Sequence, residues 1–314
     1  MSRPLISAVI PTYKRPDVIE RSVGSVLNQT WRPLELVVID DGSGDDTPKV
    51  LESFVPRAKA ADVSYRFVTV PNGGAGLARN AGVEHSVGAM VAFLDDDDAW
   101  RPDKLEKQAP ALTQSEAGVA YTRYVHQGHE DKPKPPQSAL AEGWVFEQVC
   151  DGRCRPHLQT LLVKREVFQK VGAFIAARNF QDSEFCLRAA LEFPFVCVRE
   201  PLTVIYTQES SISRSAGLEG DLRRDALKLK VLEDFGQKFA QHPRFSAKAL
   251  RTFRARIYDE HIKHLLWSDK LEEAREAHKR ALEECGELEI LRKLKGKLTR
   301  ARVMGWFGLK MKKP

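Results

Sequence analysis

Residues 89–102 read AMVAFLDDDDAWRP, an apolar run that ends in four consecutive aspartates, Asp95-Asp96-Asp97-Asp98. A run of this length and composition predicts a buried strand. Four carboxylates at the end of such a strand are costly unless a cation or a hydrogen-bond network compensates their charge. Mg²⁺ and Mn²⁺ prefer oxygen ligands, and Mg²⁺ is usually held by one or two carboxylates together with substrate phosphates. The stretch therefore predicts a site for a divalent metal and a diphosphate, with a solvated acidic turn as the alternative.

Three earlier apolar runs, residues 5–10, 34–39 and 65–70, predict further strands. Each is followed by turn or cap residues and then by helix-like sequence, the alternating pattern of a mainly parallel sheet flanked by helices. In open sheets of this kind, ligands bind beyond the carboxyl ends of the strands. The aspartates should therefore lie beside the clusters Pro11-Thr12-Tyr13 and Asp40-Asp41-Gly42-Ser43, around one nucleotide.

The third strand leads into Pro71-Asn72-Gly73-Gly74-Ala75-Gly76 and then into the helix-like segment 77–82. Glycines let backbone amides approach a ligand closely, and a helix that begins there presents unpaired N–H groups to an anion. The segment matches neither the G-x-x-x-x-G-K-[ST] phosphate loop nor a G-x-G-x-x-G fingerprint after the first strand. A flexible turn is the alternative, and only the neighbouring clusters favour an anion-binding turn.

Taken in order, six segments resemble the inverting family 2 glycosyltransferases, which bind nucleotide sugars in the GT-A fold. The segments are residues 9–13 (VIPTY), 25–30 (SVLNQT), 38–47 (VIDDGSGDDT), 76–82 (GLARNAG), 93–105 (FLDDDDAWRPDKL) and 171–174 (VGAF). No single segment is specific, but six in the family order over about the first 210 residues make a chance match a poor explanation. The resemblance implies an α/β fold with a mainly parallel sheet flanked by helices.

The resemblance also implies roles for individual residues. The nucleotide sugar would be bound by Pro11, Thr12, Tyr13, Asp41, Arg79, Asp95 and Asp96. Within this set, Thr12 and Tyr13 would line the nucleoside, and Asp41 would accept a hydrogen bond from the base. Asp97 would hold the cofactor, Mn²⁺ or Mg²⁺, with Asp95 as the second metal ligand of a D-x-D pair. The two side chains would share one face if the extended backbone continued beyond the strand.

Transfer of a sugar with inversion also needs a base for the acceptor hydroxyl. The resemblance places this catalytic carboxylate at Asp182, where Gln181 replaces the usual glutamate of a Glu-Asp pair, with Glu184 in reserve. The alternative is that Asp182 only caps the amphipathic helix that follows it. By the same resemblance, His157 would border the donor sugar, without an assigned role.

The composition excludes several other classes. The 314 residues are 42% hydrophobic, with no apolar span of membrane length and no signal-peptide pattern, so we expect a cytoplasmic protein. Processive relatives in the resembled family carry membrane helices and a Gln-x-x-Arg-Trp motif, and their lack implies one sugar per encounter. Five cysteines without a C-x-x-C pair favour reduced thiols, although Cys150 and Cys154 could form half of a redox or zinc site.

The sequence changes character near Gly217, where long stretches rich in Leu, Ala, Lys, Arg and Glu begin. We expect residues 1–216 to form the catalytic domain, with nucleotide-sugar binding in about 1–105 and the acceptor half in about 106–216. Apolar residues at helical spacing predict a helical appendage over residues 217–289. Residues 290–314 are expected to form a basic amphipathic tail.

This tail, residues 290–314, holds nine of the 49 basic residues and none of the 43 acidic ones, so the rest of the chain is slightly acidic. Basic charge interleaved with leucines and the pair Trp306-Phe307 predicts a peripheral contact with an anionic membrane surface. That contact would place the protein at the inner face of the cytoplasmic membrane. A disordered basic tail and nucleic-acid binding are the alternatives, and no nucleic-acid partner is expected because no nucleic-acid-binding fold accompanies the charge.

The sequence thus predicts a non-processive, metal-dependent inverting glycosyltransferase. It would move a sugar from a nucleoside-diphosphate sugar, with a UDP-sugar favoured, to a hydroxyl of a saccharide or lipid-linked acceptor in cell-surface polysaccharide or lipopolysaccharide synthesis. One alternative is an aspartate-nucleophile phosphotransferase, but that class has D-x-D-x-[TV] behind its first strand, and here the run follows a later strand and is followed by Ala99. The other is a nucleotide-binding scaffold without turnover.

Overall fold

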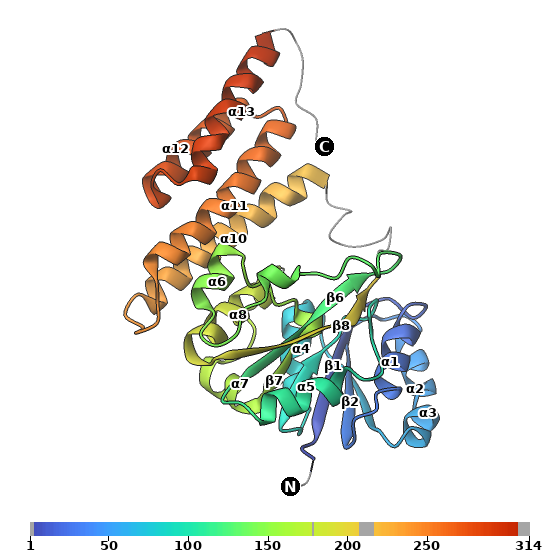
Figure 1. Ribbon diagram of the computed structural model, residues 1–314. Helices are drawn as coiled ribbons and strands as arrows, with labels where there is room; N and C mark the ends of the chain where they lie inside the picture. Colours follow the sequence, from blue (N-terminus) through green and yellow to red (C-terminus); the bar gives the residue numbers. More distant parts are fainter. Residues whose placement is uncertain (1–2, 178, 207–216, 307–314) are drawn as a thin grey trace. The chain divides into compact units, whose positions relative to one another are not determined.

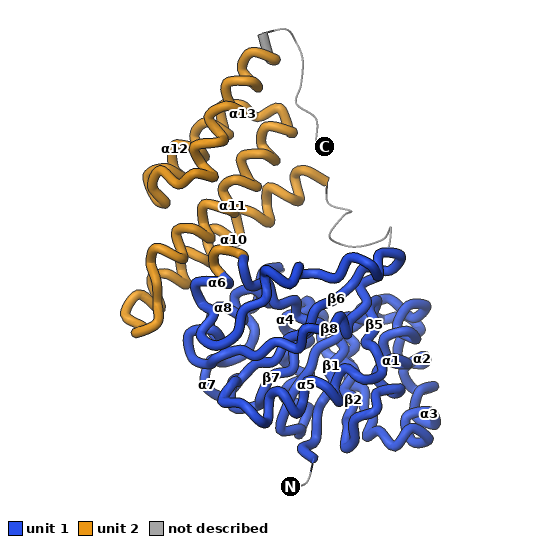
Figure 2. Tube along the Cα trace, viewed as in Figure 1, with its two compact units in different colours: residues 1–149, 153–207 blue, residues 150–152, 208–314 orange. Residues whose placement is uncertain are grey.

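The computed structural model describes residues 3–177, 179–206 and 217–306, with side chains up to Met304. The chain forms two compact units (Figure 2). The first comprises residues 1–149 and 153–207, and the second comprises residues 150–152 and 208–314. Each unit has its own core.

One eight-stranded sheet runs through the first unit in the order β3-β2-β1-β4-β7-β6-β8-β5 (Figure 1). The strands are β1 (Ile6–Thr12), β2 (Leu34–Asp40), β3 (Ser64–Thr69), β4 (Met90–Phe93), β5 (Ala99–Trp100), β6 (Val119–His126), β7 (Leu162–Lys164) and β8 (Phe195–Ile205). Strands β3, β2, β1 and β4 are parallel, and so are β6 and β8, whereas β7 and β5 pair antiparallel with their neighbours. The predicted α/β class with a mainly parallel sheet is confirmed.

Helices cover both faces of this sheet. The helices that begin in this unit are α1 (Ile19–Leu27), α2 (Thr47–Ser53), α3 (Val55–Ala60), α4 (Ala75–Glu84), α5 (Lys104–Thr113), α6 (Phe146–Asp151), α7 (Arg165–Val171) and α8 (Gln181–Glu192), with short 3₁₀ helices at Gln137–Ala139 and Leu158–Thr160. The last two residues of α6 belong to the second unit. Strand β2 shows why two layers form. Leu36 and Val38 belong to the core that includes α1, α3 and α5, while Val37 and Ile39 pack with Ala78 of α4. Alternate residues of a strand face opposite sides, so an all-apolar strand must be covered twice.

A buried carboxylate fixes the start of β4, and thereby the position of the aspartates at its other end. Glu35 accepts hydrogen bonds from the backbone N–H groups of Val87 (2.6 Å) and Gly88 (3.0 Å) and from the hydroxyl of Ser7. Position 88 must be glycine here, because a Cβ atom would lie 2.7 Å from the backbone nitrogen of Ser7. The close approach of the two segments is part of what aligns β4 with β1.

The second unit is helical. Its helices are α10 (Gly217–Phe239), α11 (Ala247–Trp267), α12 (Leu271–Cys285) and α13 (Glu289–Trp306). The helical spacing predicted in the sequence is confirmed, since Tyr258, Ile262 and Leu265 of α11 are buried together with Ala274 and Ala281 of α12. Within the described parts of the chain, no helix is both long and apolar enough to cross a membrane.

One expectation for the basic tail is wrong. Leu291, Leu294 and Leu298 were expected to face lipid, but they are buried in the core of the second unit against α11 and α12. The reason is that α13 uses its apolar stripe to close the helical core, which leaves its charged side exposed. The pair Trp306-Phe307, the other basis for a membrane contact, lies outside the residues whose side chains are described.

Candidate active site

The carboxyl ends of β1, β2 and β4 lie side by side and bring the predicted polar clusters together. The parallel register pairs Thr12 with Asp40, and the backbone N–H of Asp41 donates to the carbonyl of Thr12 at 2.9 Å. On the other side of β1, the N–H of Leu94 donates to the carbonyl of Val9 at 3.0 Å. The aspartate run therefore begins beside the end of β1, as the sequence predicts.

The run itself forms a turn and does not continue the strand. Strand β4 ends at Phe93, and the backbone N–H of Asp98 donates to the carbonyl of Asp95 at 3.2 Å. The condition for Asp95 and Asp97 to share one face, an extended backbone beyond the strand, is therefore not met, because the chain reverses at once to form β5. Asp95 and Asp97 are nevertheless the more accessible members, with side chains 31% and 20% exposed, while Asp96 and Asp98 are buried.

Arg15, in the loop after β1, neutralises the middle of the run. Its guanidinium donates to Asp96 at 2.9 Å and to Asp97 at 2.7 Å, and Asp96 also accepts from the hydroxyl of Thr12 at 2.8 Å. The sequence reasoning did not single out Arg15. The signal that could have found it was a basic pair, Lys14-Arg15, directly after a strand that neighbours the acidic one.

Arg79 and Gln159 hold the first carboxylate of the run. Arg79, in α4, donates to Asp95 at 2.6 Å, and the side-chain amide of Gln159 donates to its other oxygen. The carbonyl of Gln159 accepts from the indole N–H of Trp100 at 2.8 Å. Arg79, which the resemblance placed among the nucleotide-sugar-binding residues, thus lies beside the acidic run, and its contact with a nucleotide stays a prediction; no local signal in the sequence marks Gln159.

Burial raises the pKa of the two buried aspartates of the run, Asp96 and Asp98. It raises the pKa of Asp96 to about 6, against the opposing attraction of Arg15, and the repulsion of Asp95 and Asp97 adds a little to the rise. Burial likewise raises the pKa of Asp98 to about 8, and the charge of Asp95 adds to the rise. Asp98 accepts a hydrogen bond from the backbone N–H of Tyr206 at 3.0 Å. A cation at Asp95 and Asp97, the two more accessible aspartates, would offset the negative charge of the run.

The residues present fit a metal that is completed by substrate. Across the described ranges, no group of three or more His, Cys, Asp or Glu side chains converges as a metal site. Asp97 and Asp95 instead offer one or two hard oxygen donors, which is the usual protein share for Mg²⁺ bound together with substrate phosphates. Their assignment as metal ligands remains a prediction.

Asp41 organises the glycine-rich segment in front of α4. Its carboxylate accepts from the backbone N–H groups of Gly73 and Gly74, both at 2.8 Å, and from the amide of Asn72 at 3.3 Å. Gly74 has φ of 88°, a conformation that strongly favours glycine, and α4 begins at the next residue. Asp41 thus shapes the turn that presents the helix N-terminus, and its contact with a base remains a prediction.

Pro11 and Tyr13, two further residues expected to bind the nucleotide sugar, differ in exposure. Pro11 is buried within β1 and pairs in register with Ile39 of β2. Tyr13 is 39% exposed, and the ammonium of Lys14 lies 5.3 Å from the centre of its ring. Only Tyr13 of this pair therefore presents a face on which a base could stack.

Asp182 lies in the first turn of α8 and does not cap that helix. The capping position is taken by Phe180, at φ of 72° and without a side-chain cap, and Asp182 accepts from the N–H of its neighbour Ser183 at 2.7 Å. The capping alternative is therefore wrong. The reserve base Glu184 is also unsuitable, because Arg188 engages both of its oxygens at 2.7 Å.

The start of α8 lies against the start of α4. A Cβ atom built on Gly76 would be 3.3 Å from Cγ of Gln181 and 3.1 Å from the carbonyl of Ile175. The residue next to Asp182 therefore packs on the helix turn that follows the glycine-rich segment.

His157, whose ring centre lies 5.0 Å from that of Tyr124, has a buried Nδ1 without a hydrogen-bond partner.

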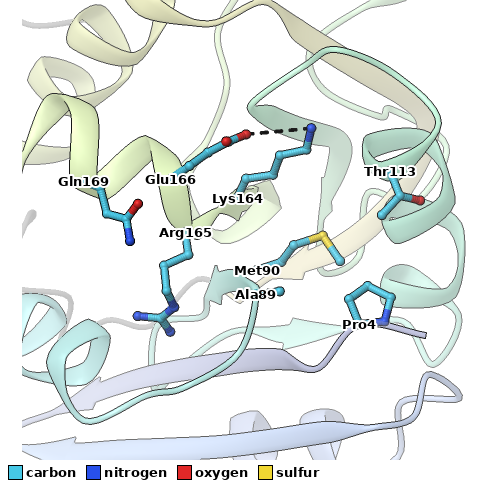
Figure 3. A pocket seen from close by; sticks show the side chains of 8 residues that line it. All are labelled: Pro4, Ala89, Met90, Thr113, Lys164, Arg165, Glu166 and Gln169. Atoms are coloured by element: carbon cyan, nitrogen blue, oxygen red, sulfur yellow. Dashed lines mark ion pairs between the residues drawn. The ribbon is translucent and has the colours of Figure 1, made fainter. Parts of the chain in front are cut away.

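A surface hollow elsewhere in the unit is unrelated to these residues (Figure 3). It has a volume of about 440 Å³ and is lined by Pro4, Ala89, Met90, Thr113, Lys164, Arg165, Glu166 and Gln169. Met90 opens β4, whereas the aspartates follow its last residue, so the hollow is at the opposite edge of the sheet. Its lining includes three charged residues, of which Lys164 and Glu166 form an ion pair at 3.9 Å and Arg165 is the third.

With this geometry in place, comparison with known proteins decides the family. The sequence model described as Glycosyl transferase family 2 matches residues 7–179, more than half of the 314-residue chain. The chain belongs to glycosyl transferase family 2. The match runs from β1 to the residue before Phe180, and it removes the aspartate-nucleophile phosphotransferase alternative.

Curated relatives are named as glycosyltransferases. The chain is 36% identical over 131 residues to TuaG of Bacillus subtilis (strain 168), a provisionally named teichuronic acid biosynthesis glycosyltransferase, covering 42% of this chain and 51% of TuaG. It is 38% identical over 121 residues to the UDP-Glc:alpha-D-GlcNAc-diphosphoundecaprenol beta-1,3-glucosyltransferase WfgD of Escherichia coli, covering 38% and 46%. The chain thus spans about half the length of these relatives.

A solved glycosyltransferase structure supports the GT-A fold. The mannosyltransferase PcManGT from Pyrobaculum calidifontis, in complex with GDP-Man and Mn²⁺, superposes with a TM-score of 0.62. The match covers 98% of this chain and 88% of that chain at 17% identity, so the likeness concerns the fold. The predicted GT-A fold with C-terminal helices is confirmed.

Proposed function

We propose that this family 2 protein is a metal-dependent, inverting and non-processive glycosyltransferase that uses a nucleoside-diphosphate sugar, with UDP as the favoured nucleotide. The observation that carries the proposal is the convergence of the aspartate turn, Arg15, Arg79 and the glycine-bounded N-terminus of α4 at one edge of the sheet. The two arginines and the helix N-terminus offer positive charge to a diphosphate, and the aspartates offer negative charge to its cation. Asp41 and Tyr13 border the same edge and would recognise the nucleoside.

The chemistry divides among the chain's own residues. The carboxylate of Asp182 would take the proton of the acceptor hydroxyl while that oxygen forms its bond to the anomeric carbon. The bond from that carbon to the diphosphate breaks on the opposite side, and its electron pair leaves with the phosphate oxygen. Arg15 and Arg79 would bind the diphosphate and orient it. A divalent cation held by Asp97 and Asp95 would supply charge neutralisation of the leaving group when bound.

A lipid-linked saccharide is the acceptor we favour. WfgD, by its name, transfers glucose to an acceptor carried on diphosphoundecaprenol, and TuaG, by its provisional name, belongs to synthesis of a cell-surface polymer. These names support cell-surface polysaccharide synthesis as the process, and a saccharide on a polyprenyl diphosphate as the acceptor class.

Release of nucleoside diphosphate from a panel of UDP-, GDP- and dTDP-sugars tests the function. We expect one donor to be hydrolysed slowly with Mn²⁺ or Mg²⁺ and not with EDTA, because water can replace the acceptor at a low rate. Addition of a polyprenyl-diphosphate saccharide should accelerate release of the same nucleotide. A protein that binds a member of the panel but never turns it over, with or without the acceptor, would instead be a nucleotide-binding scaffold. A protein that binds no member of the panel would contradict the proposed function.

Peripheral membrane contact through α13 follows from its charge. The helix exposes Arg292, Lys293, Lys295, Lys297, Arg300 and Arg302, while its leucines are buried. We therefore expect electrostatic binding to vesicles that contain phosphatidylglycerol, and loss of that binding in about 0.5 M salt, where the Debye length falls to a few ångström. Vesicles of phosphatidylcholine are the control. Binding that persists in high salt, or is equal on both vesicles, would contradict an electrostatic contact.

A further inference from the structure

Buried polar atoms without hydrogen-bond partners gather in one part of the first unit. Leaving a buried polar atom unpaired is costly, so such atoms are rare in native proteins and each needs an explanation. Among the described residues of this unit, the side chains that carry one are Thr47, Arg79, His157, Gln159, Asn179 and Gln181. All except Thr47 lie in segments that border Asp95 or the start of α4.

Gln159 has an amide whose orientation is determined. The side chain is 5% exposed, and its Nε2 donates to the carboxylate of Asp95. A carboxylate only accepts, so the amide nitrogen must face it and the amide oxygen must face elsewhere. That oxygen, Oε1, is buried and has no partner. The backbone carbonyl of the same residue is fixed by Trp100 and by the hydroxyl of Thr203, at 2.8 and 3.2 Å.

Gln181 presents a second unpaired amide oxygen. It is 7% exposed, and its Oε1 is likewise buried without a partner. The side chain packs on Gly76, and Gly76 and Arg79 lie three residues apart on one face of α4. Gln159 donates directly to Asp95, the partner of Arg79, and Gln181 packs on the face of α4 that also carries Arg79.

We infer that Oε1 of Gln159 and Oε1 of Gln181 accept hydrogen bonds from hydroxyl groups of the transferred sugar, and that they select a neutral hydroxylated hexopyranose against its uronic acid. The inference rests on the proposed function. Gln181 precedes the expected base Asp182 in the sequence. Gln159 donates to Asp95, which is two residues before the expected metal ligand Asp97. We therefore place both amides beside the sugar of the donor, between the base and the metal.

The chemistry of the two groups decides which sugars fit. Amide oxygens are acceptors, and sugar hydroxyls are the donors that a hexopyranose offers. The carboxylate of a uronic acid has no proton to donate at neutral pH. It would face two carbonyl oxygens that offer it no hydrogen-bond donor, which disfavours it. The two amides would therefore recognise the sugar and not the nucleotide. The expected contact of the nucleotide base is Asp41, which follows the end of β2.

Calorimetric titration with Mn²⁺ tests the inference by comparing free and sugar-bearing nucleotides. UDP, GDP, UDP-glucose, UDP-galactose, UDP-N-acetylglucosamine, GDP-mannose and UDP-glucuronate are titrated into the full-length wild type to find the pair it prefers. Gln159→Leu should then lose about tenfold in affinity for the preferred nucleotide sugar and keep its affinity for the free nucleoside diphosphate. Gln181→Leu should behave in the same way. Gln114→Leu, an exposed glutamine in the same unit, is the matched control.

The outcomes separate the inference from the function on which it rests. Equal losses for the free nucleotide and the nucleotide sugar would mean a structural role, and no loss in either variant would mean no role in binding; either result would overturn the inference alone. Tight binding of UDP-glucuronate by the wild type would do the same. No nucleotide binding by a wild type that melts cooperatively would overturn the proposed function as well. If Gln159→Leu does not fold, Gln181→Leu decides, because the described structure shows no hydrogen bond of the Gln181 side chain that its loss would break.

Discussion

Replacement of Asp182 by Asn is expected to lower sugar transfer by roughly 10²–10⁴-fold, the usual contribution of a general base. The substitution keeps the size of the side chain and the oxygen that accepts from the N–H of Ser183 at 2.7 Å. Asp182 also supplies no cap to α8, since Phe180 occupies that position without a side-chain cap. The variant should therefore fold normally, bind the nucleotide sugar with wild-type affinity and fail only in the transfer step.

The measurement is steady-state transfer to the acceptor, together with calorimetric binding of the donor. Asp131→Asn, in the exposed loop after β6, is the matched control and should transfer at the wild-type rate. A variant at position 182 that keeps full transfer would place the base elsewhere. Glu184 would not be the replacement, because its carboxylate is buried in an ion pair with Arg188.

The first four strands of the sheet could be predicted from the sequence because each is a distinct apolar run. The runs at 5–10, 34–39, 65–70 and 89–94 became β1 to β4 within one or two residues. Their order across the sheet follows from parallel connections through helices, and the polar ends then meet without further information. The shape of the aspartate segment was not predictable in the same way, because a four-residue strand followed by an immediate reversal depends on pairing of β5 with β8, about a hundred residues later.

The parts of the site that the sequence did not predict come from long-range contacts. Gln159 reaches Asp95 from a 3₁₀ helix 64 residues away, and nothing local distinguishes it from other glutamines. Arg15 had a weak local signal, a basic pair after a strand, but its role depends on the adjacency of β1 and β4. The basic tail shows the converse error. A helical stripe of leucines has the same pattern whether it faces lipid or a neighbouring helix, and here Leu291, Leu294 and Leu298 face helices.

We expect the second large loss of activity when the metal site is removed. Asp97→Asn should lower metal-dependent turnover at least about a hundredfold, since charge stabilisation of a leaving group by a cation is worth several kcal/mol. Binding of the nucleoside diphosphate should lose its dependence on Mn²⁺ in the same variant, which is a readout independent of activity. In the structure Asp97 accepts from Arg15 at 2.7 Å, and a neutral amide at this position could not form the ion pair, so Arg15 would turn wholly to Asp96.

EDTA distinguishes a metal ligand from a residue that only holds Arg15. If Asp97 is a ligand, EDTA should bring the wild type down to the level of Asp97→Asn and should change the variant little. Asp103→Asn, six residues further along and paired at the surface with Lys107, serves as control and should respond to EDTA like the wild type. If Asp97→Asn still responds to Mn²⁺ as the wild type does, the ligand is another carboxylate of the turn. Asp95 would then be the first to test, because its side chain is more exposed than those of Asp96 and Asp97, the other two ion-paired members of the run.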